Sequence, residues 1–343
     1  MLFSKSNPIY LIAEVGSNHE GNFKTARRLF KECIKSKADC IKIQVYTPDN
    51  LVSKKYDPKR FKHFSKLKLK ISDYIKLAKI CKKSGKDFSA SIWDKNLIKP
   101  FKNYVKFYKI GSGDLTNYEI INEILKTGKP LVISVGLSNF NDIKNFLNFI
   151  FEKNKNYILK KKISILHCNT SYPTPPKDSR LYLINKIKKK FKVQTGFSDH
   201  TIGIKTMIKA IVFGAQIIEK HYSLNPERKT FRDHQISCTN KDISKFFEKI
   251  KKINKKKRYK IKTKMQDKFI SSSEKKQNNL YSFRRSLYLK KDIKKGEKIS
   301  LKKLTSLRPL EGICASNFFK IFGKKVNQNI KSGSVLKKSY FKD

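Results

Sequence analysis

The sequence predicts an α/β protein with two folded parts, a (β/α)8 TIM barrel over residues 1–263 and a small β-rich domain over residues 281–343, joined by a linker at 264–280. The chain has 343 residues, which is more than one core usually holds, whereas such a barrel commonly takes about 250 residues. Short apolar runs alternate with helical patterns as far as His221. Beyond residue 280 the pattern changes to short β-like runs separated by glycine turns.

The expected barrel strands are short apolar runs that end in polar residues. They cover residues 10–15, 40–46, 87–91, 107–110, 131–134, 164–168, 195–199 and 217–221. Amphipathic helical patterns separate them, and the helix expected near 72–84 is followed by Gly85, a common helix stop. Because barrels of this kind keep their chemistry at the carboxyl ends of the strands, we expect the polar residues at these ends to form one site.

Two histidines at neighbouring strand ends suggest a metal site. His200 follows the strand at 195–199, and His221 ends the strand at 217–221. Adjacent parallel strands point the same way, so the two imidazoles could share one divalent ion, with Asp199 and Glu219 supplying charge or hydrogen bonds. The histidine pair alone is equally compatible with two partly buried side chains that have no ligand.

Two lysines inside barrel strands suggest an anion site. Lys42 and Lys109 would be costly to bury unless they are used, and they could neutralise a phosphate and a carboxylate. Serines at the strand ends could donate hydrogen bonds to the same anion, namely Ser91, Ser112, Ser134 and Ser198. Glu14 is a candidate acid/base or substrate-orienting group, or alternatively the ion-pair partner of a lysine.

The composition is strongly basic, with 79 Lys and Arg against 27 Asp and Glu and a net charge of +52. The excess is nearly all lysine, is spread from end to end and accompanies abundant Asn, Ile and Phe, so we interpret it as compositional bias. A nucleic-acid partner would require a basic and aromatic module or a binding motif, and we find neither. The lysine-rich run at 249–264 is interpreted as a solvated helix end and linker.

The cysteines and the N-terminus indicate a soluble cytoplasmic protein. The six cysteines include no C-x-x-C pair, which favours reduced thiols. The N-terminus has neither the long apolar run nor the cleavage site of a signal peptide, and no stretch approaches the roughly 20 apolar residues of a membrane span.

The expected C-terminal β segments cover residues 286–289, 292–300, 304–309 and 330–336, and an I-K-x-G unit occurs at 293–296 and again at 330–333. A domain of this size is marginally stable alone, so we expect it to pack on another surface.

Six motifs in order along the chain resemble the sialic acid synthase family. They are AEVGSNHEG (13–21), IKIQVY (41–46), YKIGSGD (108–114), LHCNTSYPTP (166–175), GFSDHT (196–201) and EKH (219–221). The runs RRSLYLKKDIKKGEKIS and LRPLEGI resemble the C-terminal antifreeze-like domain of that family, the SAF domain with its β-clip fold. The resemblance covers nearly the whole chain.

The resemblance implies a transferase that condenses phosphoenolpyruvate with an open-chain N-acetylmannosamine-type aldose, giving a nonulosonic acid and phosphate. It implies a divalent ion, Mn²⁺ with Mg²⁺ or Co²⁺ as alternatives, held by His200 and His221. The implied phosphoenolpyruvate cradle is Lys42, Ser91, Lys109, Ser112, Ser134 and Ser198. The other implied roles are Glu14 as a group that orients the sugar or serves as acid/base, Glu219 beside the metal and water, and Gln44, Thr170, Tyr172 and Asp233 on the sugar side.

Arg308 resembles the family arginine that reaches from the small domain of one subunit into the barrel of the other, which implies a domain-swapped homodimer. From the sequence alone an Arg-Pro pair also fits a surface turn. Three departures from the family pattern are Ser91, Thr170 and Arg284, and we expect the last two on the sugar side. The acceptor therefore stays open among N-acetylmannosamine, its 6-phosphate and a di-N-acetylated 6-deoxy hexose that leads to legionaminic or pseudaminic acid.

Two alternatives to this function are a related synthase and a non-catalytic relative. A deoxyheptulosonate or deoxyoctulosonate phosphate synthase would share the barrel, but the C-terminal Arg-Pro domain argues against it. A non-catalytic relative would have lost at least one of Lys42, Lys109, His200 and His221, and all four are present.

Overall fold

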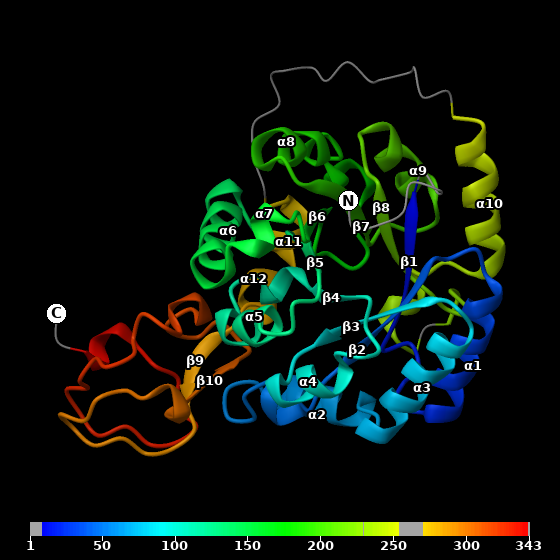
Figure 1. The fold of residues 1–343 in the computed structure, drawn as a ribbon. Helices are drawn as coiled ribbons and strands as arrows, with labels where there is room; N and C mark the ends of the chain where they lie inside the picture. The colour runs from blue at the N-terminus through cyan, green and yellow to red at the C-terminus, as the bar shows by residue number, and fades with distance from the viewer. Residues whose placement is uncertain (1–8, 229, 254–269, 342–343) are drawn as a thin grey trace.

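The computed structural model describes residues 9–228, 230–253 and 270–341 and confirms the barrel (Figure 1). Eight parallel strands form a closed barrel in the order β1 to β8. Their bounds are Tyr10–Gly16, Cys40–Val45, Asp87–Ile92, Phe107–Ile110, Leu131–Ser134, Ile163–Cys168, Gln194–Asp199 and Ile217–His221. Each lies within two residues of the expected run at either end, because alternating short apolar runs are a strong local signal of a buried strand.

The barrel closes between its first and last strands, and this closure brings distant residues together. Glu14 on β1 pairs in register with Lys42 on β2 and with His221 on β8. On the neighbouring strands, Ser198 pairs with Glu219. Since residues in register on parallel strands point to the same face, the barrel itself aligns these side chains at its carboxyl end.

Helices cover the outside of the barrel. The longer ones are α1 Phe23–Lys35, α2 Pro58–Leu67, α3 Ile71–Lys83, α5 Tyr118–Leu125, α6 Phe140–Asn154, α8 Tyr182–Phe191, α9 Lys205–Val212 and α10 Asn240–Lys251. Helix α6 shows why they form: a capping box of Asn139 and Asp142 starts it, and apolar Ile143, Phe146 and Ile150 face the core.

A layer of apolar side chains fills the barrel interior beneath its polar carboxyl end. It consists of Ile12, Cys40, Phe107, Val132, Leu166 and Ile217. A larger apolar cluster lies between the strands and the outer helices. The polar residues at the carboxyl end therefore rest on a packed floor and not on an open channel.

The C-terminal unit is β-rich and packs on the barrel, as expected. Strands β9 (Ser286–Leu289) and β10 (Leu304–Leu307) pair antiparallel. The expected β runs at 292–300 and 330–336 do not form continuous strands. They are joined by isolated bridges, such as the one between Ile293 and Ile330. The unit has its own small core, which includes Leu287 and Phe318. In Figure 1 it lies to one side of the barrel, coloured orange to red.

The segment expected to be a polar linker at 264–280 is only partly described, and its described part is folded. Residues 270–280 contain α11 (Ser272–Lys276) and the start of α12 (Asn279–Phe283), and both Glu274 and Asn279 are buried. The polar side chains expected in this linker find hydrogen-bond partners on the barrel. The expected boundary at 263 and most of the lysine-rich run lie outside the described residues, and the domain boundaries stay predictions.

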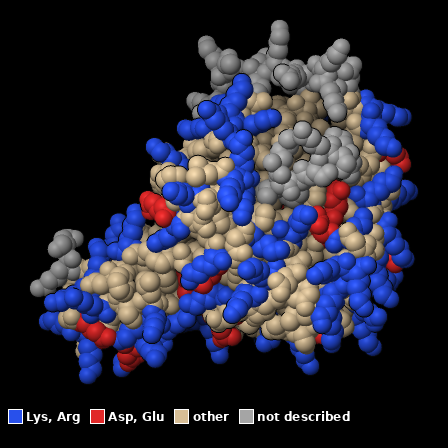
Figure 2. Space-filling model, viewed as in Figure 1, with Lys and Arg blue, Asp and Glu red and all other residues tan. Residues whose placement is uncertain are grey.

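The surface agrees with the compositional interpretation on the face that Figure 2 shows, where lysine and arginine are spread over both the barrel and the C-terminal unit. All six cysteines are free thiols, as expected. Within the described ranges, no helix combines the length and the apolar character that crossing a membrane requires.

Candidate active site

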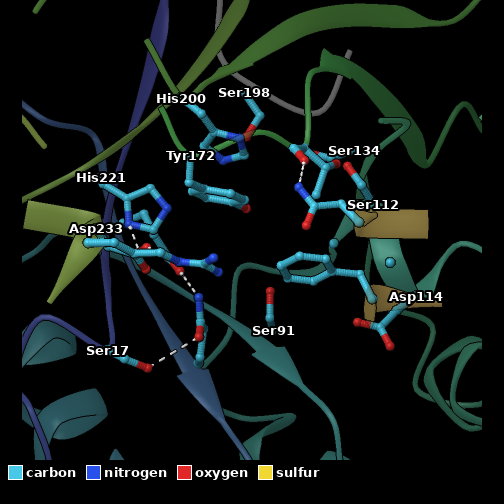
Figure 3. A pocket seen from close by; sticks show the side chains of 18 of the residues that line it. Ser17, Ser91, Ser112, Asp114, Ser134, Tyr172, Ser198, His200, His221 and Asp233 are labelled. Carbon is cyan, nitrogen blue, oxygen red and sulfur yellow. Dashed lines mark hydrogen bonds and ion pairs between the residues drawn. The ribbon is translucent and has the colours of Figure 1, made fainter. Parts of the chain in front are cut away.

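One pocket of about 590 Å³ opens at the carboxyl end of the barrel, a size suited to small substrates. The structure brings fifteen of the site residues named from the sequence to this pocket, and Asp199 and Arg284 do not line it. The fifteen are Glu14, Lys42, Gln44, Ser91, Lys109, Ser112, Ser134, Thr170, Tyr172, Ser198, His200, Glu219, His221, Asp233 and Arg308. Figure 3 shows His200, His221 and Tyr172 on one side of the cavity and Ser112 and Ser134 on the other.

Lys42 and Glu14 form a buried ion pair on the pocket floor, with 2.6 Å between Nζ and Oε2. Gln44 donates to the other Glu14 oxygen at 3.1 Å, and Lys42 also donates to Ser91 Oγ at 3.3 Å. Burial by itself would lower the pKa of Lys42, but the charges of Glu14 and Glu219 outweigh it and raise this pKa. Lys42 therefore stays charged, and the ion-pair alternative for Glu14 is confirmed.

Lys109 has a different environment. Its Nζ donates to Ser134 Oγ at 2.6 Å and lies 3.6 Å from Glu219. Burial lowers its pKa, and repulsion from Lys42 adds to this effect, although Glu219 opposes it. Of the two lysines, Lys109 is the one whose positive charge is least compensated, so an anionic ligand would stabilise it most.

Glu219 connects this lysine to the histidine side of the pocket. Its Oε1 accepts a hydrogen bond from Ser198 at 2.9 Å. Burial by itself would raise its pKa, but the charges of Lys109 and Lys42 hold this pKa well below the usual range. Its Oε2 is buried and has no hydrogen-bond partner among the described residues. Glu219 is thus an ionised carboxylate with one oxygen open to water or substrate.

A tight group of polar atoms lies opposite, where the loops after β4, β5 and β6 meet. Gly136 N–H donates to Ser112 Oγ at 3.0 Å. A Cβ atom at Gly136 would come within 2.4 Å of Thr170 Oγ1, so only glycine fits. Thr170 Oγ1 is itself buried, and it lacks a hydrogen-bond partner among the residues that the structure describes. A buried hydroxyl without a partner indicates a place where a ligand binds.

The two histidines are arranged as ligands for one cation would be. His200 Nδ1 lies 2.6 Å from the Asn169 carbonyl oxygen, which can only accept, so Nδ1 carries the proton and Nε2 has the free lone pair. Burial, and then the neighbouring His221, lower the pKa of His200 to about 3, so the ring is neutral. The two ring centroids are 5.7 Å apart. His221 Nδ1 is buried and has no hydrogen-bond partner among the described residues.

These residues fit a divalent ion as a pair of imidazole ligands. Within the described ranges no group of three or more His, Cys, Asp or Glu side chains surrounds one metal position, so water or substrate would supply the remaining ligands. Asp199, which we expected to support the histidines, instead forms a fully buried ion pair with Lys220 at 3.0 Å. That expectation is wrong because the Asp199 side chain does not reach the pocket.

The residues that we expected on the sugar side form an aromatic and charged wall. Tyr172 packs on His200 with 4.3 Å between ring centroids. Asp233 lies 3.8 Å from His221 Nδ1. Arg308 pairs with Asp114 at 3.1 Å, and its guanidinium lies 4.8 Å from the Trp93 ring. Arg308 enters the pocket of its own chain here, and exchange of the C-terminal unit between two subunits stays a prediction.

The sequence analysis missed a group of arginines around one aromatic ring. The guanidinium groups of Arg60, Arg308 and Arg232 lie 5.1, 5.5 and 5.8 Å from the Phe283 centroid. Phe283 directly precedes the RRSLYL motif, which was a usable signal, whereas Arg60 comes from an unremarkable stretch of the β2–β3 connection. Arg284, expected on the sugar side, does not line the pocket, because its side chain donates to Leu137 O and Ser138 Oγ instead.

Comparison with known proteins identifies the family of both parts of the chain. The NeuB family model matches residues 29–262, and the SAF domain model matches residues 284–342. The chain is 31% identical over 340 residues to N,N'-diacetyllegionaminic acid synthase of Campylobacter jejuni, covering 95% of this chain and 98% of that protein. It is 30% identical to a pseudaminic acid synthase of the same species, covering 99% and 98%.

Among solved structures, a spore coat polysaccharide biosynthesis protein of Bacillus subtilis superposes with a TM-score of 0.80 over 99% of this chain and 97% of that one. The two are 22% identical, so this match supports the fold alone.

Proposed function

The chain belongs to the NeuB family, and from this premise we propose that it condenses phosphoenolpyruvate with an N-acetylated amino-sugar aldose to give a nonulosonic acid and inorganic phosphate. The observation that carries the proposal is the pairing of two sites in one pocket. Buried lysines and serines that could hold an anion line the same pocket as two imidazoles, and Figure 3 shows Ser112 and Ser134 across the cavity from His200 and His221. N-acetylmannosamine is the first candidate acceptor, and a di-N-acetylated 6-deoxy hexose is the alternative.

Binding of phosphoenolpyruvate would use the uncompensated charge of the floor. Lys109 Nζ donates a hydrogen bond to Ser134 Oγ, and Lys42 Nζ donates one to Ser91 Oγ, so each lysine is already paired with a serine hydroxyl at the pocket. A phosphate or carboxylate placed between the two lysines would raise the pKa of Lys109 again. The fixed lysine and serine donors would replace the water that the anion loses on binding.

The reaction forms one carbon–carbon bond and breaks one carbon–oxygen bond. The methylene carbon of phosphoenolpyruvate attacks the aldehyde carbon of the open-chain sugar, and the aldehyde oxygen takes a proton to become a hydroxyl. Water then forms a carbon–oxygen bond to the cationic carbon, which still carries the phosphate, and gives up one proton in place of the one taken by the aldehyde oxygen. Phosphate leaves with its bridging oxygen and takes the second proton, and the added oxygen becomes the keto oxygen. When bound between His200 and His221, a divalent ion supplies Lewis acidity to the aldehyde oxygen.

The two carboxylates of the pocket, Glu219 and Glu14, suit different steps of this reaction. Glu219 stays ionised because both lysines favour its charged form, so it stabilises positive charge on the reacting carbon and orients the water. Glu14 accepts one hydrogen bond from Gln44 and pairs with Lys42, so it is placed to accept a hydrogen bond from the sugar and orient it. Tyr172, Asp233 and Arg308 would position the sugar.

The test is phosphate release from phosphoenolpyruvate with Mn²⁺ present, adding N-acetylmannosamine, its 6-phosphate and the two di-N-acetylated 6-deoxy hexoses one at a time. Release that depends on one acceptor supports the reaction and identifies the sugar. Absence of release with every acceptor, from a folded and metal-loaded protein, overturns the proposal.

We also propose that the active form is a homodimer whose subunits exchange their C-terminal units. The observation behind it is that Arg308 completes the pocket from a separate folded unit. Mixing K109A and R308A subunits tests it, because exchange would combine an intact barrel with an intact Arg308 in the mixed dimer. Activity above that of either variant supports exchange, and a simple average of the two contradicts it.

A further inference from the structure

The segment before the C-terminal unit makes an unexpected set of contacts with the barrel. Glu274 on α11 is 1% exposed. Its Oε1 accepts hydrogen bonds from the backbone N–H groups of Leu137 at 3.2 Å and Thr170 at 2.8 Å. Leu137 follows β5 and Thr170 follows β6, so one carboxylate oxygen ties together two neighbouring loops of the barrel mouth.

Leu137 needs such support because its backbone is strained. Its φ angle is +57°, in the left-handed region that residues other than Gly, Asn and Asp rarely adopt. Glu274 binds its N–H, and Arg284 Nη2 donates to its carbonyl oxygen at 2.9 Å and to Ser138 Oγ at 2.6 Å. Both polar groups of this residue are therefore held by side chains from the segment at 271–285.

The same loops shape the anion cradle. Gly136, next to Leu137, donates to Ser112 and fits closely against Thr170. Asn279 on α12 donates to the Thr170 carbonyl oxygen at 2.6 Å. The positions of Ser112, Gly136 and Thr170 relative to one another thus depend on contacts that come from outside the barrel.

Glu274 itself is fully satisfied, which suits a fixed anchor. Its second oxygen accepts from Ser271 N–H at 2.8 Å and Ser271 Oγ at 2.9 Å, and Arg180 lies 3.6 Å away. Removing the carboxylate would leave two buried loop N–H groups without an acceptor, which costs more than the bonds themselves contribute.

We propose that Glu274, Asn279 and Arg284 form a clamp that sets the shape of the anion cradle, with Glu274 as a positioning residue for the binding of phosphoenolpyruvate. The identity of the anion rests on the proposed function, whereas the clamp does not. The consequence is that the barrel alone has an incomplete cradle, and that docking of the segment at 271–285 completes it.

The test compares E274A with S271A in the full chain. Both changes remove one half of the α11 capping box, but only E274A takes away the acceptor of the Leu137 and Thr170 amides. The first measurement is hydrogen–deuterium exchange of the peptides that contain residues 137 and 170. Exchange should become faster in E274A and stay unchanged in S271A, and unchanged exchange in E274A overturns the clamp.

The second measurement is the Kd of phosphoenolpyruvate by calorimetry, with kcat and KM beside it. Displacement of a binding group by a fraction of an ångström should weaken binding in E274A roughly ten- to a hundredfold, with a smaller effect on kcat. An unchanged Kd in E274A overturns the positioning role. If E274A does not fold, E274Q keeps one acceptor oxygen and should give the same changes at smaller size, and wild-type behaviour of E274Q in both measurements overturns the clamp.

Failure of the proposed function looks different. In that case wild-type protein releases no phosphate with any acceptor, while the exchange measurement still decides whether the clamp exists.

Discussion

The floor and the wall of the pocket are built in different ways. The floor, with Glu14, Lys42, Lys109 and Glu219, lies on strands whose backbone register fixes each side chain. The part of the wall that contains Arg308 and Phe283 comes from residues after 270, and it meets the barrel through a few buried side-chain contacts. A change on the floor should therefore remove chemistry and leave its neighbours in place, whereas a change in the wall should displace them.

The largest expected effect is on the floor. K109A removes the lysine with the least compensated charge, so we expect kcat/KM for phosphoenolpyruvate to fall by about 10³-fold or more. The melting temperature should fall less than in D114N, because the buried Glu219 loses the charge of Lys109 but keeps that of Lys42. The matched control is K106A, since Lys106 is half-exposed and pairs only loosely with Asp87 at 3.9 Å. Near-normal turnover by K109A would contradict the assignment of the floor.

Replacing one of the two histidines should reduce activity strongly, as K109A does on the floor. H200A removes one of two imidazoles beside the cavity, and we expect at least a hundredfold loss of kcat/KM together with weaker Mn²⁺ binding by electron paramagnetic resonance. Chelation of wild-type protein should have the same effect and be reversed by Mn²⁺.

The control for this prediction is H167Q. His167 lies on β6, but its Nε2 donates to the Ser179 carbonyl oxygen at 2.7 Å, away from the pocket. Equal Mn²⁺ affinity in H200A and wild type would exclude His200 as a ligand.

In the wall the expected effect is smaller on catalysis and larger on structure. D114N takes the carboxylate away from both Arg285, 2.6 Å from it, and Arg308. Leaving two buried guanidinium groups without an anion should lower the free energy of unfolding by about 3 kcal/mol. We expect KM for the acceptor sugar to rise roughly tenfold, since Arg308 loses its fixed position.

Calorimetry measures the change in the free energy of unfolding, and kinetics at several acceptor concentrations measure the change in KM. E311Q is the control, because Glu311 pairs with the exposed Tyr281 hydroxyl on the surface of the same unit. A D114N protein with wild-type stability would show that the wall is held by other contacts.

The smallest expected effect is a shift in pH dependence. Burial and Lys42 lower the pKa of Lys109, and only its protonated form attracts an anion. Activity at low phosphoenolpyruvate should thus be present below this pKa and lost as the pH rises through it, before an ordinary lysine would titrate. K109R should move this alkaline limb to higher pH, because a guanidinium stays charged. K42R should leave the limb in place, since Glu14 raises the pKa of Lys42. An alkaline limb that does not move in K109R assigns it to another group.

The sequence by itself determined the floor. Strand positions follow from alternating apolar runs, and the carboxyl ends of parallel strands meet at one end of a barrel, so Lys42, Lys109, His200 and His221 could be assigned to one site before any coordinates. Local pattern and barrel geometry suffice for that. The family motifs then added Tyr172, Asp233 and Arg308.

Only the tertiary structure decided which polar side chains support the pocket from outside it. Asp199 pairs with Lys220 and not with the histidines, Arg284 supports a loop and not the sugar side, and Glu274 is a buried anchor where a polar linker was expected. A polar side chain in a short helix or a strand end has the same local pattern whether it faces water, a neighbouring loop or a ligand. Which of these it meets depends on how distant segments dock, and that free energy is a sum of long-range contacts that no sequence window contains.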